Sequence, residues 1–153
     1  MVPIQHEILV VDDNPDILSL TRALLSEKGF KVRVANTGQG AVASCRLSPP
    51  DMVLLDLSLP DLSGYEVCSL LKEQVVTREI PVVFVSTSHG TIDKVKAFSL
   101  GAVDFITKPF HEPELLARIN THLTISQLQR RLQEFSQELE QRVDQQTQEL
   151  SRV

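Results

Sequence analysis

The sequence predicts an α/β protein in which a parallel sheet carries helices on both faces. Two observations support this fold class. Short apolar segments alternate with helical segments five times over about 120 residues, which is the pattern of repeated strand–helix–strand units. Several of the apolar segments also end in acidic or other polar residues, as parallel strands do at the sheet edge where ligands bind.

The strands are recognised as short apolar runs bounded by turn residues. We expect them over residues 7–12, 31–35, 52–56, 81–85 and 103–106. The run from Met52 to Leu55 is entirely apolar, which indicates a strand buried on both faces rather than a helix. In the second segment charged residues alternate with Val32 and Val34, as in a half-buried edge strand.

The helices are recognised by their caps and by apolar residues that recur on one face. We expect them over residues 15–28, 37–47, 65–72 and about 91–100, with a last helix that opens at residues 112 and 113. Asn14 and Pro15 are the N-cap and first residue of the first helix, and Gly29 ends it. Neither glycine nor proline occurs after Pro113, so the last helix is expected to outlast the domain.

Composition excludes several classes of protein. The chain has 153 residues, 42% hydrophobic residues and a net charge of −5, which suits one compact domain with a segment left over and gives no sign of a nucleic-acid surface. No apolar run approaches the roughly 18 residues of a membrane span, and the N-terminus lacks the pattern of a signal peptide. Cys45 and Cys68 fit neither a redox pair nor a zinc site. We therefore expect a cytoplasmic protein.

Five polar residues are expected at the carboxyl edge of the sheet: Asp12, Asp13, Asp56, Ser86 and Lys108. Neighbouring carboxylates repel one another unless a cation compensates them, and an all-oxygen cluster suits Mg²⁺. Lys108 could neutralise a phosphoryl oxygen, and Ser86 could donate a hydrogen bond to it. Each residue alone would fit an ordinary cap, turn or loop. Together they are the groups needed for accepting a phosphoryl group.

These motifs resemble the response-regulator receiver domains of two-component signalling, the CheY-like family. The resemblance covers roughly residues 6–124. The matching motifs, in the family's order, are Asp12-Asp13, Asp56 with Leu59-Pro60 and Gly64, residues 81–86, and residues 101–110. The resemblance implies a flavodoxin-like, doubly wound five-stranded sheet in the order 2-1-3-4-5. It also implies a receiver domain over residues 1–124.

By this resemblance Asp56 is the phosphorylated residue. Asp13 and Asp56 would bind Mg²⁺ directly, Asp12 would assist, and the backbone carbonyl of Ser58 would complete the protein ligands. Lys108 would pair with the phosphoryl group.

The resemblance also implies a conformational switch. Ser86 and Phe105 match the family's switch pair, so that Ser86 would close on the phosphate and the Phe105 ring would move inward. The bond between Lys108 and Pro109 is cis in the family. Three positions depart from the commonest pattern. Ser86 replaces Thr but keeps the hydroxyl, Phe105 lacks the hydroxyl of Tyr, and Thr87 is bulkier than the usual Ala or Gly, which bears on the lifetime of the phosphoryl group.

The last helix carries an apolar seam on a charged, Gln-rich surface. The seam consists of Leu128, Leu132, Phe135, Leu139, Val143 and Leu150. From Leu128 to Leu139 to Leu150 the step is eleven residues, which favours a nearly straight or slightly right-handed supercoil. We expect residues 125–153 to bury the seam in a parallel homodimeric coiled coil, with a frayed, solvated tail as the alternative. Pairing through the fourth helix, fifth strand and fifth helix stays open.

A basic DNA-binding region is a rival interpretation of this helix, but residues 121–153 are slightly acidic. Residues 139–143 and 147–150 instead resemble the signalling helices that link receiver or sensory domains to histidine kinase or cyclase outputs, although Gln146 replaces the usual Arg. This second resemblance suggests that the chain is the N-terminal part of a longer signalling protein.

The sequence therefore predicts a receiver, not itself an enzyme, that accepts a phosphoryl group from a histidine kinase or a histidine phosphotransfer protein. No direct nucleic-acid or membrane partner is expected. Two rival folds fit less well: residues 12–15 do not match the nucleophile motif of haloacid dehalogenase-type phosphohydrolases, and no Gly-rich turn follows the first strand as in Rossmann nucleotide binders. A receiver that is never phosphorylated and serves as a constitutive dimeric scaffold is the non-catalytic alternative.

Overall fold

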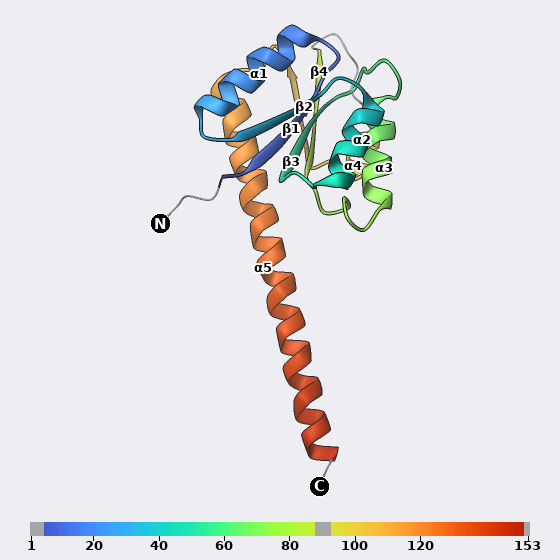
Figure 1. Ribbon diagram of the computed structural model, residues 1–153, viewed down its shortest axis with the longest axis vertical. Helices are drawn as coiled ribbons and strands as arrows, with labels where there is room; N and C mark the ends of the chain where they lie inside the picture. The colour runs from blue at the N-terminus through green and yellow to red at the C-terminus, as the bar shows by residue number, and fades with distance from the viewer. Residues whose placement is uncertain (1–4, 88–92, 152–153) are drawn as a thin grey trace. The chain divides into compact units, whose positions relative to one another are not determined.

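The computed structural model describes residues 5–87 and 93–151, with side chains as far as residue 148. Within these ranges strands and helices alternate along the chain (Figure 1). The strands are β1 (Glu7–Val11), β2 (Lys31–Ala35), β3 (Met52–Asp56), β4 (Val82–Thr87) and β5 (Asp104–Lys108). The helices are α1 (Pro15–Glu27), α2 (Gly38–Leu47), α3 (Gly64–Glu73), α4 (Lys94–Ser99) and α5 (Glu112–Ser151). The predicted α/β fold class is confirmed.

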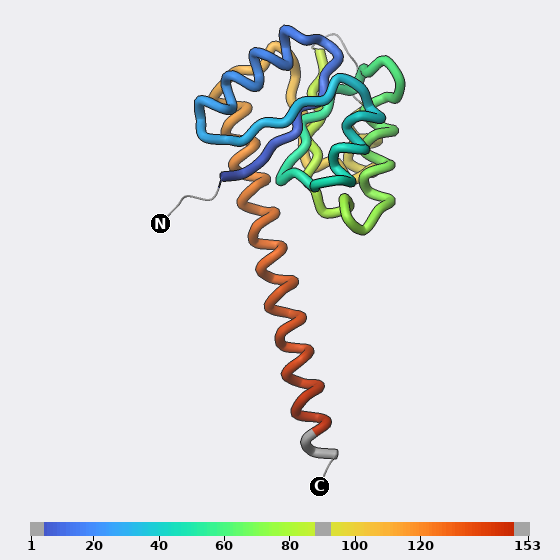
Figure 2. The backbone as a smooth tube through the Cα atoms, in the orientation of Figure 1, coloured from blue at the N-terminus to red at the C-terminus, as the bar shows by residue number. Residues whose placement is uncertain are grey.

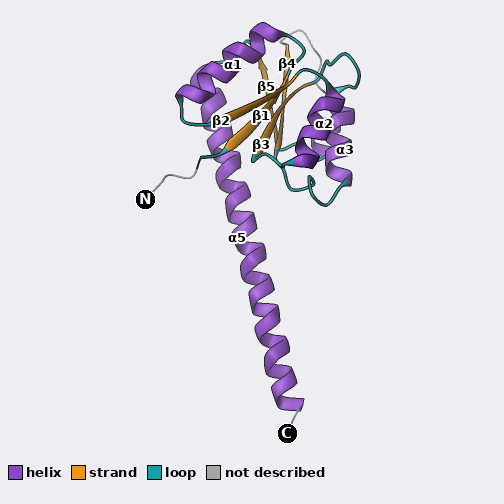
Figure 3. Ribbon diagram, viewed as in Figure 1, coloured by secondary structure: helices purple, strands orange, loops and turns teal. Residues whose placement is uncertain are grey.

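The strands form one parallel sheet in the order β2-β1-β3-β4-β5, which confirms the expected topology (Figure 3). β3 lies at the centre, and every residue from Met52 to Asp56 is buried. β2 lies at an edge and is at most half-buried. The strand order reverses between β1 and β3, and the crevice at such a reversal is where parallel sheets bind ligands.

The sheet separates two hydrophobic cores. On one face, residues such as Leu55 and Phe84 pack against α2, α3 and α4. On the other face, Leu54 and Ile106 pack against α1 and the first turns of α5. Consecutive strand residues enter opposite cores because side chains alternate along a strand. The backbone trace shows α2 and α3 side by side on their face, with α1 across the sheet from them (Figure 2).

The residues predicted to cap the first helix take the expected positions at its two ends. The Asn14 side chain accepts hydrogen bonds from the amides of Asp16 and Ile17 at the start of α1. After α1, Gly29 takes a φ of 93°, a conformation that side chains with a Cβ resist. The predicted start of the fourth helix near residue 91 lies outside the described residues; α4 is described from Lys94, with Asp93 as its N-cap.

Two strands run further than predicted. The expected ends at residues 85 and 106 fall two residues short, because β4 continues through Thr87 and β5 through Lys108. Ser86 pairs with Thr107 and Thr87 with Lys108 in the ladder between these strands. The backbone ladder, rather than the change from apolar to polar side chains, sets the ends. Ser86 and Lys108, which were expected just after strands, are therefore strand residues like Asp56.

The chain divides into a first unit that ends at Leu123 and a second that begins at Thr124. Helix α5 contributes its first turns to the first unit and makes up the described part of the second. Within the part of the chain that the structure describes, no helix combines the length and apolarity needed to cross a bilayer. The peptide bond between Lys108 and Pro109 is cis, as the resemblance implies.

An ion pair at the opposite edge of the sheet from the predicted site links β1, β2 and α2. The Arg33 guanidinium pairs with the Glu7 carboxylate and also donates to the Ser44 carbonyl at 3.0 Å and the Ser48 carbonyl at 2.8 Å. The hydrogen bond from Arg33 is the main reason that the pKa of Glu7 lies below its ordinary value of 4.5.

We predict that Glu7→Gln lowers the free energy of unfolding at pH 7 and makes its fall on acidification shallower. A depressed native pKa means that the ionised carboxylate stabilises the fold above the unfolded pKa, and that this contribution disappears as pH falls through the folded pKa. Urea denaturation between pH 7 and pH 3 measures the effect. The exposed Glu79→Gln is the control and should follow the parent curve. Parallel curves for Glu7→Gln and the parent chain would refute the prediction.

Candidate functional site

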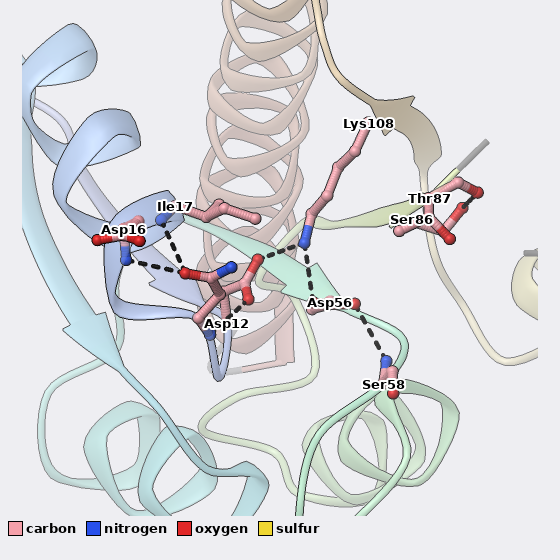
Figure 4. Close-up of polar contacts among 9 residues, drawn as sticks. Asp12, Asp16, Ile17, Asp56, Ser58, Ser86, Thr87 and Lys108 are labelled. Atoms are coloured by element: carbon pink, nitrogen blue, oxygen red, sulfur yellow. Dashed lines mark hydrogen bonds and ion pairs between the residues drawn. The ribbon is translucent and has the colours of Figure 1, made fainter. Parts of the chain in front are cut away.

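Three charged side chains meet at the carboxyl edge of the sheet (Figure 4). Asp12 follows β1, while Asp56 and Lys108 are the last residues of β3 and β5. Their side chains are only 4%, 10% and 12% exposed, respectively. They line a cleft of about 660 Å³. The predicted residues Asp13, Ser58 and Ser86 line the same cleft.

The Lys108 ammonium connects the two buried carboxylates. Its Nζ donates to Asp56 Oδ2 at 2.9 Å and also to Asp12 Oδ2. The remaining oxygens accept backbone amides: Asp12 Oδ1 from Asn14 at 2.9 Å, and Asp56 Oδ1 from Ser58 at 3.1 Å. Each carboxylate is therefore oriented by one cation and one N–H group, which fixes its rotamer.

Burial and neighbouring charge act against each other at this site. Burial raises the pKa of Asp56 and the nearby Asp12 adds to the rise, while Lys108 and the Ser58 amide oppose it. Burial by itself would lower the pKa of Lys108, but the hydrogen bonds and charges of Asp12 and Asp56 outweigh it and raise that pKa overall. Lys108 is therefore a permanent cation beside a carboxylate that is costly to keep ionised.

Asp13 completes a cluster of carboxylate oxygens. One oxygen from each of Asp12, Asp13 and Asp56 lies within 4.8 Å of the others, and Asp13 is the exposed member. Three carboxylates and the single ammonium of Lys108 leave two negative charges, which a divalent cation would balance. Oxygen donors at this spacing suit a hard cation such as Mg²⁺. The residues present therefore fit the ion that the resemblance implies.

The loop after β3 packs closely against the end of its own strand. Gly64, the first residue of α3, donates its N–H to the Leu57 carbonyl at 2.9 Å. A Cβ at Gly64 would lie 2.5 Å from the Asp56 carbonyl oxygen and 2.8 Å from Leu57 Cα. Only glycine permits this approach between backbone segments. The contact restrains the backbone that carries Asp56 and leads into Ser58.

Ser86 and Thr87 occupy the last two positions of β4. Ser86 is 4% exposed, and its Oγ lies 3.4 Å from the Thr87 carbonyl, which is a long and weak hydrogen bond. In Figure 4 this pair stands apart from the connected contacts of Asp12, Lys108 and Asp56. The Ser86 hydroxyl thus lines the cleft but donates its hydrogen bond to the Thr87 carbonyl and not to the Asp56 carboxylate.

Phe105 is the predicted residue that the structure does not bring into the cleft. Its ring is half-buried against α4, where it meets Phe98 edge to face with ring centroids 6.2 Å apart. The Lys94 ammonium lies 4.7 Å from the Phe105 ring centroid. Such edge-to-face and cation–π contacts each contribute on the order of 0.5–1 kcal/mol. The ring is therefore held against α4 and not in the cleft.

Asp61 and Tyr65 line the cleft without having been predicted as site residues. Asp61 accepts hydrogen bonds from the amides of Gly38 at 2.7 Å and Gln39 at 2.9 Å, and these bonds lower the pKa of its carboxyl group. Tyr65 accepts a hydrogen bond from the Asp93 amide at 3.0 Å. The first amides of α2 and α4 need acceptors, as those of any helix do. Tertiary packing decides which distant side chain accepts from these amides, so the spacing of residues in the sequence does not predict it.

Comparison with known proteins gives a consistent assignment. Residues 8–120 match the family described as the response regulator receiver domain. The transcriptional regulatory protein KdpE of Mycobacterium tuberculosis is 43% identical over 112 residues, which are 73% of this chain and 48% of KdpE. A probable cyclic di-GMP phosphodiesterase of Vibrio cholerae is 38% identical over 119 residues, which are 78% of this chain and 27% of that protein. The chain spans about half the length, or less, of these curated relatives.

Among solved structures, the receiver domain of a putative LuxO repressor protein from Vibrio parahaemolyticus is similar along nearly its whole length. The TM-score is 0.76 at 26% identity, and the match covers 82% of this chain and 95% of that one. The similarity extends to most of the first unit and agrees with the strand order described above.

We predict that Gly64→Ala weakens binding of Mg²⁺ and lowers the free energy of unfolding by about 1–3 kcal/mol, since the new methyl group would press on the Asp56 carbonyl and Leu57. Tyr65 is the chain's single tyrosine and there is no tryptophan, so intrinsic fluorescence reports on the cleft during a Mg²⁺ titration.

Gly29→Ala is the matched control for this prediction. A Cβ there meets no atom within 4 Å, and the change introduces only backbone strain at a φ of 93°, which costs roughly 1–2 kcal/mol. It should therefore lower stability but leave Mg²⁺ affinity unchanged. Equal Mg²⁺ affinity for Gly64→Ala and the parent chain would contradict the role given to this contact.

Proposed function

The chain belongs to the response regulator receiver domain family, and on this premise we propose that it accepts a phosphoryl group on Asp56 from a histidine kinase or a histidine phosphotransfer protein. The observation that carries the proposal is the setting of Asp56. It is a buried carboxylate at the carboxyl edge of the sheet, with an ammonium 2.9 Å from one oxygen and two further carboxylates beside it. A carboxylate nucleophile, a fixed cation and a place for Mg²⁺ are what phosphoryl acceptance requires.

Asp56 would act as the nucleophile. One of its oxygens forms a bond to phosphorus while the phosphorus–nitrogen bond of the donor phosphohistidine breaks, and that electron pair leaves with the imidazole. Lys108 already lies at an Asp56 oxygen and is placed to contact a phosphoryl oxygen, while the Ser58 amide keeps the carboxylate oriented. Mg²⁺ held by Asp13, Asp56 and the Ser58 carbonyl, with help from Asp12, would supply positive charge that offsets the carboxylates and the incoming group.

The same site would drive the switch. The Ser86 hydroxyl, weakly held at 3.4 Å, would turn to donate to a phosphoryl oxygen. The Phe105 ring would then leave Lys94 and Phe98 and move inward. Its present contacts with α4 fit the outer position expected before phosphorylation. This is a two-state transition that a local charge event would bias.

We further propose that residues 1–124 act as the receiver and that residues 125–153 pair as a parallel homodimeric coiled coil. The support is the seam of α5, whose described side chains are 45% to 72% exposed: Leu128, Leu132, Phe135, Leu139 and Val143. The side chain of Leu150 lies outside the described residues. A long helix with such a stripe gains most of its stability from a partner, and a second copy offers the same stripe.

The output of the whole protein is also part of the proposal. The relatives named above include a transcriptional regulator and a probable phosphodiesterase, and this chain matches only part of each. We propose a cytoplasmic signalling protein in which the helix leads to a histidine kinase or cyclase type of output. The slightly acidic helix makes direct binding of nucleic acid by this chain unfavourable.

We predict that Asp56→Asn abolishes labelling by a radioactive small-molecule phosphodonor in the presence of Mg²⁺, because the amide is not a nucleophile of this kind. Asp61→Asn is the matched control: it removes a carboxylate that lines the same cleft but holds α2 instead, and it should still be labelled. Labelling of Asp56→Asn at the parental level would exclude Asp56 as the acceptor. No labelling of the parent chain would favour the unphosphorylated scaffold.

We predict that Leu132→Lys weakens self-association by more than 100-fold. Each copy would lose the burial of one leucine, so the dimer loses about 3 kcal/mol or more. Sedimentation equilibrium measures the dimer constant. The neighbouring exposed Gln133→Lys adds the same charge off the seam and should associate nearly as the parent does. If Leu132→Lys keeps its affinity, the interface lies elsewhere, as on the face of α4, β5 and α5.

A further inference from the structure

A second group of charged side chains lies at the opposite end of β5 from Lys108. Asp104 is the first residue of the strand, and its carboxylate accepts hydrogen bonds from Arg118 Nη1 at 2.8 Å to Oδ1 and 2.7 Å to Oδ2. His122 Nε2 lies 3.0 Å from Asp104 Oδ2. Arg118 and His122 are one turn apart on α5. We name these three residues the Asp104 cluster.

Burial, charge and hydrogen bonding fix the positions of the side chains in the Asp104 cluster. The Asp104 and His122 side chains are 14% and 16% exposed, so their interaction is only partly screened by water. Burial opposes ionisation of Asp104, but Arg118, His122 and a backbone amide outweigh it and keep its pKa below the ordinary value. As an ionised carboxylate only accepts hydrogen bonds, His122 must present Nε2–H to it. Arg118 also pairs with Glu114 at 3.2 Å.

The fourth contact of this carboxylate links it to the proposed switch. Asp104 Oδ1 accepts the backbone N–H of Phe105 at 2.8 Å. A shift of the β5 backbone at Phe105 therefore carries the Asp104 carboxylate with it. Hydrogen bonds of this length weaken steeply once geometry departs from the preferred range, so Arg118 and His122 must either follow the carboxylate or lose it.

The cluster lies near the end of the part of α5 that packs on the sheet. Leu115, Ile119 and Leu123 place one row of the helix in the core shared with α1. Arg118 and His122 lie on the adjacent row, and His122 directly precedes Leu123, where the first unit ends. The ionic contacts thus act on the last turn of α5 in the first unit, six residues before Leu128, where the seam begins.

Resting on the phosphoacceptor role proposed above, we infer that Asp104 is a positioning residue that couples the switch strand to the signalling helix through Arg118 and His122. Asp104 contacts neither the phosphoryl site nor the seam. Its role is therefore in the coupling between phosphoryl acceptance and association through the seam. Phosphoryl acceptance at Asp56 would move β5 at Phe105, and the Asp104 cluster would convert that movement into a changed setting of α5 at Leu123. The seam beyond would then associate more tightly.

The test separates binding at the site from its effect on the helix. Mg²⁺ with beryllofluoride, a phosphoryl mimic, is titrated while Tyr65 fluorescence reports its binding, and sedimentation equilibrium gives the dimer constant with and without it. In the parent chain we expect the mimic to tighten association by roughly fivefold or more, within the usual range of coupling between sites. In Asp104→Asn, which keeps the shape but removes the charge, the mimic should bind as before and tighten association less than twofold.

Arg118→Met is the second variant and should lose the coupling in the same way, which guards against a folding defect specific to Asp104→Asn. Circular dichroism checks the fold of each variant. Glu114→Gln is the matched control, because it breaks only the exposed pair with the same arginine, and it should keep the parental coupling.

Three outcomes would overturn the inference. These are full coupling in both Asp104→Asn and Arg118→Met, binding of the mimic to the parent chain without any change in association, and loss of association in both states of Asp104→Asn. The last would place Asp104 in the interface itself. Failure of the mimic to change Tyr65 fluorescence in the parent chain is a different result, since it would overturn the proposed phosphoacceptor function.

Discussion

The structure depends on an excess of negative charge held at the carboxyl edge of the sheet. Asp12 and Asp56 are buried there because β1 and β3 are neighbouring strands of one parallel sheet, and β5 brings a single ammonium to meet them. One cation does not balance three carboxylates, so the cleft keeps an affinity for further positive charge. Such a site trades stability for binding, which is common where function requires unfavourable electrostatics.

Packing in the two cores explains how the fold tolerates the excess negative charge at this edge of the sheet. Each strand contributes alternate side chains to both faces, so the position of every strand end is fixed from two sides at once. The close contact at Gly64 adds a backbone restraint on the loop that follows Asp56. The polar cleft thus rests on rigid packing, and in the proposed switch the movement is confined to the elements that border it: the end of β4, β5 at Phe105 and the helices α4 and α5.

Much of this could be predicted from the sequence, because the responsible signals are local. The apolar run at residues 52–55, the cap at Asn14 and the alternation of strands and helices specify fold class, and parallel topology then brings Asp12, Asp56 and Lys108 together. Strand ends were less predictable, since the ladder continues through polar Ser86 and Thr87. Side-chain partners were the least predictable part of the structure.

The partners of Asp61 and Tyr65 come from elements distant in the sequence, and those of Phe105 and Asp104 from the helices on either side of β5; no spacing within the chain indicates any of them. Arg118 and His122 illustrate the difficulty. Their separation of one turn shows that they share a helix face, yet it is the packing of α5 beside β5 that turns this face toward Asp104. Local patterns define which elements form, while packing decides which side chains meet.

The continuity of α5 has a geometric consequence of its own. A helix advances only about 1.5 Å per residue but turns by about 100°, so it conveys rotation far more sensitively than translation. Whatever is joined to this helix would be reoriented by a single inserted residue, whereas an insertion of eleven residues would return it to within about 20° of its original azimuth. The rotational phase of the helix, rather than its length, then sets the direction in which a residue beyond Leu123 faces.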